Sequence, residues 1–153
     1  MLTNKKYKIS DLKADKDLLK KIKILSRKVT CEQLKIFDED TIIICLYGTK
    51  VVGVCCISMK SPETHFDNEE VEVPYLYNYM CDITYKKMRP SLSIMCYIKT
   101  CLKLGGNRFI NLDVLDDNAH AMQFFEKNNF VKAGEYNQSI KQYIMYTCDI
   151  GEL

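Results

Sequence analysis

The chain has 153 residues, of which 47% are hydrophobic and 27% charged, and its formal net charge is +2. This ordinary globular composition fits a single domain over residues 1–153, without low-complexity runs, internal repeats or a membrane-spanning apolar stretch. The charge is small and dispersed, so we expect neither a nucleic-acid partner nor a membrane partner.

The eight cysteines fall mostly inside apolar runs such as "TIIICLYG" and "VVGVCCISM", a position typical of small core residues. No pair has the C-x-x-C spacing of zinc or redox sites, and the N-terminus carries no apolar segment of the signal-peptide type. We therefore expect a reducing, cytoplasmic location and no metal site.

The first half of the chain predicts one helix and one hairpin. Apolar residues recur at helical spacing from Leu18 to Val29, which indicates an amphipathic helix. Two β-rich runs follow, Thr41–Tyr47 and Lys50–Met59, and Gly48 between them suits a tight reversal. Both strands are apolar enough to be central and buried.

A polar loop and a third strand come next. Residues 60–74 are rich in proline and glutamate and predict a loop. The following "YLYNYMCDI" alternates tyrosines with other residues, which predicts a strand with Tyr75, Tyr77 and Tyr79 on one aromatic face.

The second half alternates helices and strands. After the basic turn "TYKKMRPS", the segment "LSIMCYIKTCLKLGG" predicts a helix that ends at Gly105 and Gly106. "RFINLDVLDD" predicts a strand, Asn118 or Asp117 can cap a helix through "AHAMQFFEKNN", and two closing strands follow. This order predicts an α/β fold of mixed (α+β) type with a βαβα unit in the middle.

The C-terminal third resembles the GNAT family of acyl-CoA-dependent N-acetyltransferases. The family's fifth strand and following helix usually read L-x-V-x-x-x-N-x-x-A-x-x-F-Y-E-K-x-G-F, and the matching residues are Leu112, Val114, Asn118, Ala121, Phe124, Glu126, Lys127 and Phe130. A pattern similar to the family's G-x-x-V-G runs from Gly48 to Gly53. The resemblance implies a GNAT-like acyl-CoA N-acyltransferase fold, with a central mixed sheet flanked by helices.

The same resemblance implies that the turn after the fourth strand binds the pyrophosphate of acetyl-CoA. The family pattern R/Q-x-x-G-x-G/A uses glycine so that backbone N–H groups converge on the phosphates at a helix N-terminus. On that pattern Lys86 takes the first position, Arg89 the first glycine and Ser91 the last small residue, with Pro90 between. A Cβ at Arg89 could force the backbone out of shape, whereas the charges of Lys86, Lys87 and Arg89 could replace lost backbone contacts. A solvated basic turn before a helix would explain the same residues.

Further cofactor contacts follow only from the resemblance, and involve Met80, Cys81, Asp82, Met88, Asn118 and Phe125. The backbone N–H of Met80 or Cys81 would polarise the thioester carbonyl. Asn118 would contact the cofactor or only cap its helix.

Aminolysis of a thioester needs a group that takes the proton of the amine, and often an acid for the departing thiolate. The acid in this family is frequently the tyrosine of F-Y-E-K, but this chain has Phe125 there. Tyr136 is our substitute, with Tyr85 and Tyr143 as alternatives, although each could be a packing residue. His65 and His120 have no companion at nucleophile or metal spacing.

The base candidates are Asp82 and Asn78 at the end of the strand, and Glu72 or Glu70 just before it. The acidic run from Glu63 to Glu72 could attract a cationic small-molecule or peptide amine, or be a solvated loop.

Two functions stay open from the sequence. The leading hypothesis is an N-acetyltransferase that transfers an acetyl group from acetyl-CoA to a primary amine by direct attack. The alternative is a catalytically inactive protein of this fold that acts as an interaction or structural module, which the departures at Arg89 and Phe125 favour. A homodimer is compatible with either function.

Overall fold

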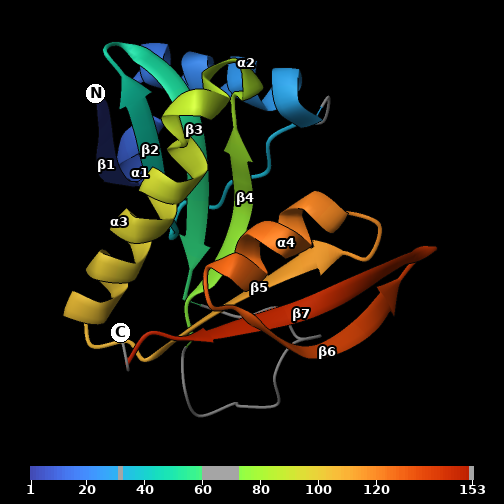
Figure 1. Cartoon of the computed structure of the whole chain (residues 1–153). Coiled ribbons are helices and arrows are strands. Elements are labelled where there is room, and N and C mark those ends of the chain that lie inside the picture. Colours follow the sequence, from blue (N-terminus) through green and yellow to red (C-terminus); the bar gives the residue numbers. More distant parts are fainter. Residues whose placement is uncertain (31–32, 60–72, 152–153) are drawn as a thin grey trace. The chain divides into compact units, whose positions relative to one another are not determined.

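The computed structural model describes residues 1–30, 33–59 and 73–151. Its helices and strands follow in this order (Figure 1): β1 (Leu2–Lys8), α1 (Ile9–Leu12), α2 (Lys16–Thr30), β2 (Thr41–Tyr47), β3 (Lys50–Ser58), β4 (Tyr75–Cys81), the 3-10 helix η1 (Ile83–Met88), α3 (Pro90–Leu104), β5 (Phe109–Leu115), α4 (Ala119–Lys127), β6 (Val131–Gln138) and β7 (Lys141–Asp149). No helix in these ranges combines the length and apolar character needed to cross a membrane.

The strands form one seven-stranded sheet in the order β1-β2-β3-β4-β5-β7-β6. The pair β4–β5 is parallel, whereas β1–β2, β2–β3, β5–β7 and β6–β7 are antiparallel. The predicted fold class, a mixed central sheet flanked by helices, is therefore confirmed.

Packing divides the chain into two units. The first contains residues 1–58 and 77–100, and the second contains residues 59–76 and 101–153. The strand β4 and the helix α3 are each divided between the units. The prediction of a single domain stays a prediction.

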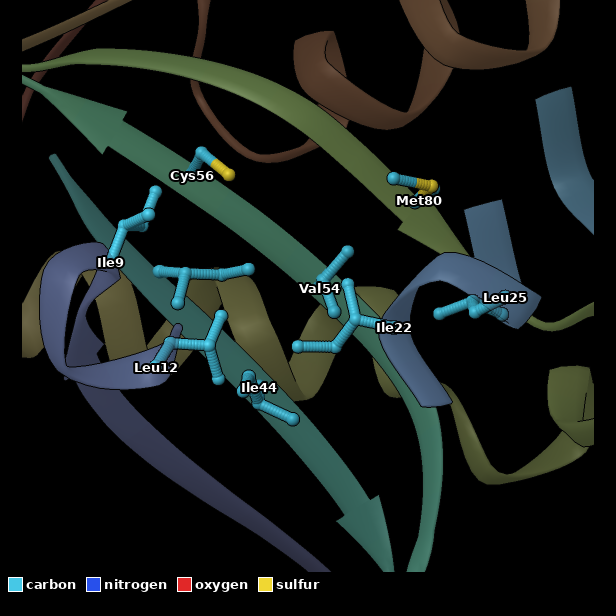
Figure 2. Packing of buried hydrophobic residues seen from close by; sticks show 9 residues of the cluster. Ile9, Leu12, Ile22, Leu25, Ile44, Val54, Cys56 and Met80 are labelled. Atoms are coloured by element: carbon cyan, nitrogen blue, oxygen red, sulfur yellow. The ribbon is translucent and has the colours of Figure 1, made fainter. Parts of the chain in front are cut away.

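In the first unit, α1 and α2 pack on one face of the sheet. Figure 2 shows the cluster that they form with β2, β3 and β4, whose buried members are Ile9, Leu12, Ile22, Leu25, Ile42, Ile44, Val54, Cys56 and Met80. Ile22 and Leu25 of α2 are buried and Leu18 and Leu19 pack against the cluster, so that the predicted amphipathic helix is present, but Val29, which the predicted pattern included, is exposed.

The predicted hairpin is confirmed. The strand β2 has the predicted bounds, β3 ends one residue earlier than predicted, and Gly48 makes the turn with a φ of 62°. At this φ a residue without Cβ avoids the left-handed penalty.

The opposite face of β3 carries α3. A Cβ added to Gly53 would lie 2.7 Å from Ile94 Cδ1 and 2.9 Å from Cys81 Sγ, so α3 approaches β3 where that side chain is missing. The helix begins at Pro90 and ends before Gly105 and Gly106, where the sequence predicted its stop.

Three elements were not predicted: the strand β1, the four-residue helix α1 and the helix η1. The strand β1 lies at the edge of the sheet and is largely exposed, so its sequence "LTNKKYK" lacks the apolar alternation that marks a half-buried strand. The helix η1 lies where we expected a loop, because its sequence has no apolar periodicity and its residues are not buried.

The predicted aromatic face of β4 is wrong beyond Tyr77. Asn78 has a φ of 51°, so that the chain leaves the extended conformation for one residue. Tyr77 consequently packs with Met80 against the α1–α2 cluster, whereas the Tyr79 hydroxyl donates to the carbonyl of Ser91 in α3. Asparagine tolerates the left-handed region, which explains why a strand sequence can carry this interruption.

The second unit is built on β5, β7 and β6. Residues Ile110, Leu112 and Val114 of β5 are buried, as are Tyr146 and Cys148 of β7. Cys148 Sγ lies 3.8 Å from the carbonyl oxygen of Asn128 at the end of α4.

We predict that Gly53→Ala lowers the free energy of unfolding by about 1–3 kcal/mol, because the added methyl overpacks the contact between β3 and α3. Urea denaturation measures the effect. Adding Ile94→Val, which removes the clashing Cδ1, should recover part of the loss. If the double variant is no more stable than Gly53→Ala, the contact with Ile94 is not the cause.

Candidate functional site

The candidate site is the loop that connects β4 to α3. It consists of Asp82, η1, Arg89 and the first turn of α3. All of it lies in the first unit. It begins at Asp82, whose backbone N–H donates to the carbonyl of Val52 in β3 at 2.8 Å. The Asp82 carboxylate accepts the Thr84 N–H at 3.0 Å, and its carbonyl accepts the Tyr85 N–H at 3.0 Å. Asp82 therefore caps the helix η1.

A lysine from α2 completes this first anchor. Lys28 Nζ lies 2.9 Å from Asp82 Oδ1 and 3.0 Å from Oδ2, and donates to Thr84 Oγ1 at 3.0 Å. The Asp82 side chain is 11% exposed and that of Lys28 is 50% exposed. The start of the loop is thus joined to both β3 and α2.

These contacts favour the charged form of the Asp82 carboxyl group. Burial alone would raise the pKa of its carboxyl group, but the hydrogen bonds from Lys28 and Thr84, together with the charge of Lys28, outweigh burial and lower that pKa below its ordinary value. A carboxylate held in this way is a weak proton acceptor. Its predicted role as the base is untested, and its contacts support the role of a loop anchor.

Aromatic packing holds the middle of the loop. The ring of Tyr85 lies against the ring of Tyr47 in the hairpin, with centroids 5.9 Å apart and planes at 49°. Lys50 Nζ lies 6.0 Å from the centroid of the Tyr85 ring. Residues on both sides of the hairpin turn therefore contact Tyr85, which directly precedes the basic residues of the loop.

The loop is held at its far end by Tyr79. Its hydroxyl donates to the Ser91 carbonyl at 2.5 Å, which connects β4 to the first turn of α3. Burial, followed by the proximity of several thiols, raises the pKa of Tyr79 well above its ordinary value, so that its hydroxyl stays a donor.

Between these anchors, the backbone at Arg89 is left-handed, with φ 55° and ψ 56°. Its N–H donates to the Lys86 carbonyl at 3.0 Å, and its carbonyl accepts the Ser93 N–H at 3.1 Å. An L-residue in this conformation costs about 1–2 kcal/mol relative to glycine. The position that the family pattern gives to glycine thus keeps a glycine-type backbone, and its Cβ has not forced the chain out of that conformation.

The side chains between the anchors face solvent. Lys86, Lys87, Met88 and Arg89 are exposed, whereas Pro90 is buried at the first position of α3. The first N–H groups of an α-helix have no partner within the helix and carry the positive end of its dipole. Three cations therefore lie close in sequence to a helix N-terminus, a combination that suits a diphosphate.

The remaining candidates of the first unit have structural partners. Asn78 Nδ2 donates to the Lys35 carbonyl at 2.7 Å, and an amide has no basic lone pair to take a proton from an amine. Met80 is buried in the core cluster. Burial raises the pKa of the Cys81 thiol to about 11, so it is not an activated nucleophile. Glu70 and Glu72 lie outside the described residues.

The second unit holds the other candidates. The Tyr136 hydroxyl donates to Asp113 Oδ2 at 2.6 Å, and the Tyr75 hydroxyl donates to the same oxygen at 2.9 Å. The rings of Tyr136 and Tyr143 stack, with centroids 5.2 Å apart and planes at 13°. A phenol proton engaged with a carboxylate is less available to a leaving thiolate, although the role of Tyr136 as the acid is not tested.

Asn118 and Phe125 lie in or next to α4. Asn118 Oδ1 accepts the Ala121 N–H at 3.1 Å, so the capping role is confirmed, and the cofactor contact stays a prediction. Phe125 is buried, with its ring edge-on to that of Phe130 at 5.6 Å. The residue that replaces the family's tyrosine is thus part of the core.

Within the described ranges, no group of three or more histidine, cysteine or acidic side chains could hold a metal ion. The seven cysteines of these ranges are free thiols.

Sequence patterns did not indicate Lys28, Tyr47, Thr84 or Asp113. Lys28 is one of many exposed lysines on α2, and nothing in its spacing connects it to a residue more than fifty positions away. A weak signal existed for Asp113, because its strand alternates polar and apolar residues in "NLDVL".

The sheet topology and its helices give the chain a GNAT-type acyl-CoA N-acyltransferase fold, and the loop at the N-terminus of α3 is basic. No protein-family model matches the chain. No curated protein matches it either.

Solved structures do match. The ribosomal-protein-S18-alanine N-acetyltransferase from Escherichia coli aligns over 98% of this chain and 94% of its own, with 13% identity and a TM-score of 0.74. An aminoglycoside 6′-N-acetyltransferase complexed with coenzyme A aligns over 97% of both chains, with 13% identity and a TM-score of 0.75. The NatC complex bound to Gag peptide and CoA matches over 97% of this chain and 98% of its own, with 12% identity and a TM-score of 0.69. The predicted resemblance is confirmed at the level of the fold.

We predict that Arg89→Gly is more stable than Arg89→Ala by about 1 kcal/mol, because both lose the charge and only alanine keeps a Cβ in the left-handed region. Chemical denaturation compares the two. At the exposed helical residue Lys20 the order should reverse, with alanine more stable than glycine. Equal stability of the two Arg89 variants would contradict a left-handed backbone.

We predict that the Asp82 carboxyl titrates below 3.8 in the native protein and at higher pH in Lys28→Met, where burial is less opposed. Carbon-13 NMR of the carboxyl group measures both values. Asp149, whose pKa a hydrogen bond from Arg108 lowers, serves as the internal control and should not move.

The same shift has a consequence for stability. Because the folded pKa of Asp82 lies below the unfolded value, its contribution is present above about pH 4 and is lost as the pH falls through the folded pKa. An unchanged Asp82 midpoint in Lys28→Met would show that Lys28 does not hold the carboxylate in its charged form.

Proposed function

We propose that the protein is an N-acetyltransferase that binds acetyl-CoA through the loop from η1 to α3 and transfers the acetyl group to a primary amine. One observation carries the proposal: Arg89, at the position that the family pattern gives to glycine, has the left-handed backbone that glycine adopts without a steric penalty. A residue held in a costly conformation at a ligand loop is typical of a functional site.

The charges of the loop support the same assignment. The exposed Lys86, Lys87 and Arg89 adjoin the N-terminus of a fifteen-residue helix. Cationic side chains and helix N–H groups together favour a diphosphate over a neutral ligand. Two of the matching structures are complexes with CoA, which is consistent with this ligand class.

The reaction balances without a further reagent. The nitrogen of a neutral amine attacks the thioester carbonyl carbon, so that an N–C bond forms and the C–S bond breaks. The electron pair of that bond leaves with the CoA sulfur, and the proton lost by nitrogen passes to a base and finally to the thiolate. The backbone N–H of Met80 or Cys81 is our proposed donor to the carbonyl oxygen.

The acid and the base are less sharply defined. Asp82 and Asn78 are engaged in anchoring contacts, and Phe125 offers no hydroxyl. Tyr136 remains our proposed acid and Glu72 a proposed base, both on the family resemblance and their place in the sequence. CoA thiolate is a good leaving group, so the proposal does not depend on an acid.

The acceptor is proposed as a class: a small-molecule or peptide primary amine. The described acceptors of the matching proteins include an aminoglycoside and a ribosomal-protein alanine. A cytoplasmic location and a homodimer also stay proposals.

The alternative function is an interaction module without catalysis. Of the two departures that favoured it, Arg89 now supports it less, because its backbone has the left-handed conformation that a glycine would adopt. Phe125 still does, because it is buried among apolar residues and supplies no acid.

We expect native protein to bind acetyl-CoA in calorimetry with a micromolar dissociation constant, and affinity to fall with rising salt because the loop contacts are charged. Arg89→Gly, which keeps the backbone and loses one cation, should bind about three- to tenfold more weakly. A panel of primary amines is then screened for release of free CoA thiol.

Two results would overturn parts of this proposal. Binding by Arg89→Gly but not by the native protein would mean that the arginine blocks the site, and would favour the interaction module. No binding by either protein would remove acetyl-CoA as the ligand of this loop.

A further inference from the structure

Lys28 joins three separate segments of the first unit. It belongs to the last turn of α2, yet its ammonium group lies within 3.0 Å of both Asp82 oxygens and of Thr84 Oγ1. Asp82 follows β4, and Thr84 lies in the first turn of η1. One side chain therefore connects a helix to the point where the candidate loop begins.

The two partners of this ion pair differ in their exposure to solvent. The Asp82 side chain is 11% exposed, so its charge has little access to water and needs a hydrogen-bonded partner within the protein. Lys28 is 50% exposed and keeps much of its hydration. Removal of Lys28 would therefore leave the largely buried Asp82 carboxylate with only its contacts in η1. Removal of Asp82 would cost Lys28 less, because water still solvates the lysine.

The carboxylate in turn determines the conformation of η1. Its Oδ1 accepts the Thr84 N–H, and the Asp82 carbonyl accepts the Tyr85 N–H. If Asp82 turns toward water to regain solvation, the Thr84 N–H loses its acceptor. The first turn of η1 would then open more often, and the strained Arg89 lies only one residue beyond its end.

We infer that Lys28 is a positioning residue of the acetyl-CoA loop: through Asp82 and Thr84 it keeps η1 in the conformation that binds the diphosphate before the ligand arrives. This inference rests on the proposed function for its consequence, but the effect on the loop is measurable without any ligand. Lys28 contacts neither the ligand nor the reacting atoms in this role.

A purely structural salt bridge would behave differently. In Lys28→Met, a local opening of η1 lets Asp82 regain water without global unfolding of the chain. Lys28→Met should accordingly leave the global unfolding midpoint almost unchanged. The effect of the substitution should be confined to the order of the loop and to the affinity that depends on it.

The test uses three variants of the full chain: Lys28→Met, Lys28→Arg and the control Lys23→Met. Lys23 is an exposed lysine of the same helix. Amide hydrogen exchange at Thr84 and Tyr85 is measured without ligand, and acetyl-CoA affinity is measured by calorimetry. In any active preparation, KM for acetyl-CoA and kcat are determined separately.

We expect exchange at Thr84 and Tyr85 to be about tenfold faster in Lys28→Met, and acetyl-CoA binding to be about tenfold weaker, the size typical for loss of a hydrogen bond to a charged group. The KM should rise while kcat stays unchanged. Lys28→Arg should restore both exchange and affinity to within about threefold, because a guanidinium can also pair with the carboxylate. Lys23→Met should match the native protein.

Native exchange rates together with native affinity in Lys28→Met would overturn the inference and leave the proposed function intact. Faster exchange with native affinity would also overturn it, because loop order would then not matter for binding. If native protein fails to bind acetyl-CoA at all, the proposed function falls and this inference falls with it. A lower global stability of Lys28→Met, unrescued by arginine, would indicate a structural role instead.

Discussion

The left-handed turn at Arg89 is the constraint on which the candidate site depends. The chain passes from η1 into α3 at a single left-handed residue, Arg89, whose N–H bonds back to Lys86 and whose carbonyl bonds forward to Ser93. An arginine adopts this conformation at a cost that its own side chain does not offset. The contacts of Asp82, Tyr85 and Tyr79 hold the loop on both sides of Arg89. These contacts offset the conformational free energy that the left-handed residue costs.

A second left-handed residue shapes the strand that leads to the loop. Asn78 interrupts β4, so that Tyr77 and Met80 share one face and Tyr79 points toward α3. Without this interruption, strict alternation would direct Tyr79 to the same side as Tyr77, and its hydroxyl could not reach Ser91. The hydrogen bond from Tyr79 to Ser91 therefore depends on the irregularity of β4 at Asn78. The conformation of the loop thus depends on two residues with a positive φ, Asn78 and Arg89.

The sequence predicted the regular elements well and the contacts of the site poorly. The hairpin, α2, α3 and the strand–helix unit around Asn118 were found because burial imposes a period on their residues. The strand β1 and the helix η1 escaped because exposed segments carry no such period. Family spacing singled out Arg89, but no pattern of residue types reveals the sign of φ at a residue that is not glycine.

The partners of Asp82 illustrate the same limit. A carboxylate after a strand is typical of both a base and a helix cap, and only the tertiary contact with Lys28 separates the two roles. That contact spans fifty-four positions, and its geometry depends on how α2 packs on the sheet. Ile22 and Leu25 fix that packing, so two core residues set where a surface lysine can reach.

The anchors at the two ends of the loop share a property that bears on kinetics. The pKa of the Asp82 carboxyl group is lowered and the pKa of the Tyr79 phenol is raised. Asp82 therefore stays a charged acceptor and Tyr79 a neutral donor near neutral pH, and both keep their hydrogen bonds. Neither group changes its protonation state across the range in which an amine acceptor loses its proton. Under the proposed function, a pH–rate profile would therefore record the ionisation of the acceptor and of the base, with no contribution from these two anchors of the loop.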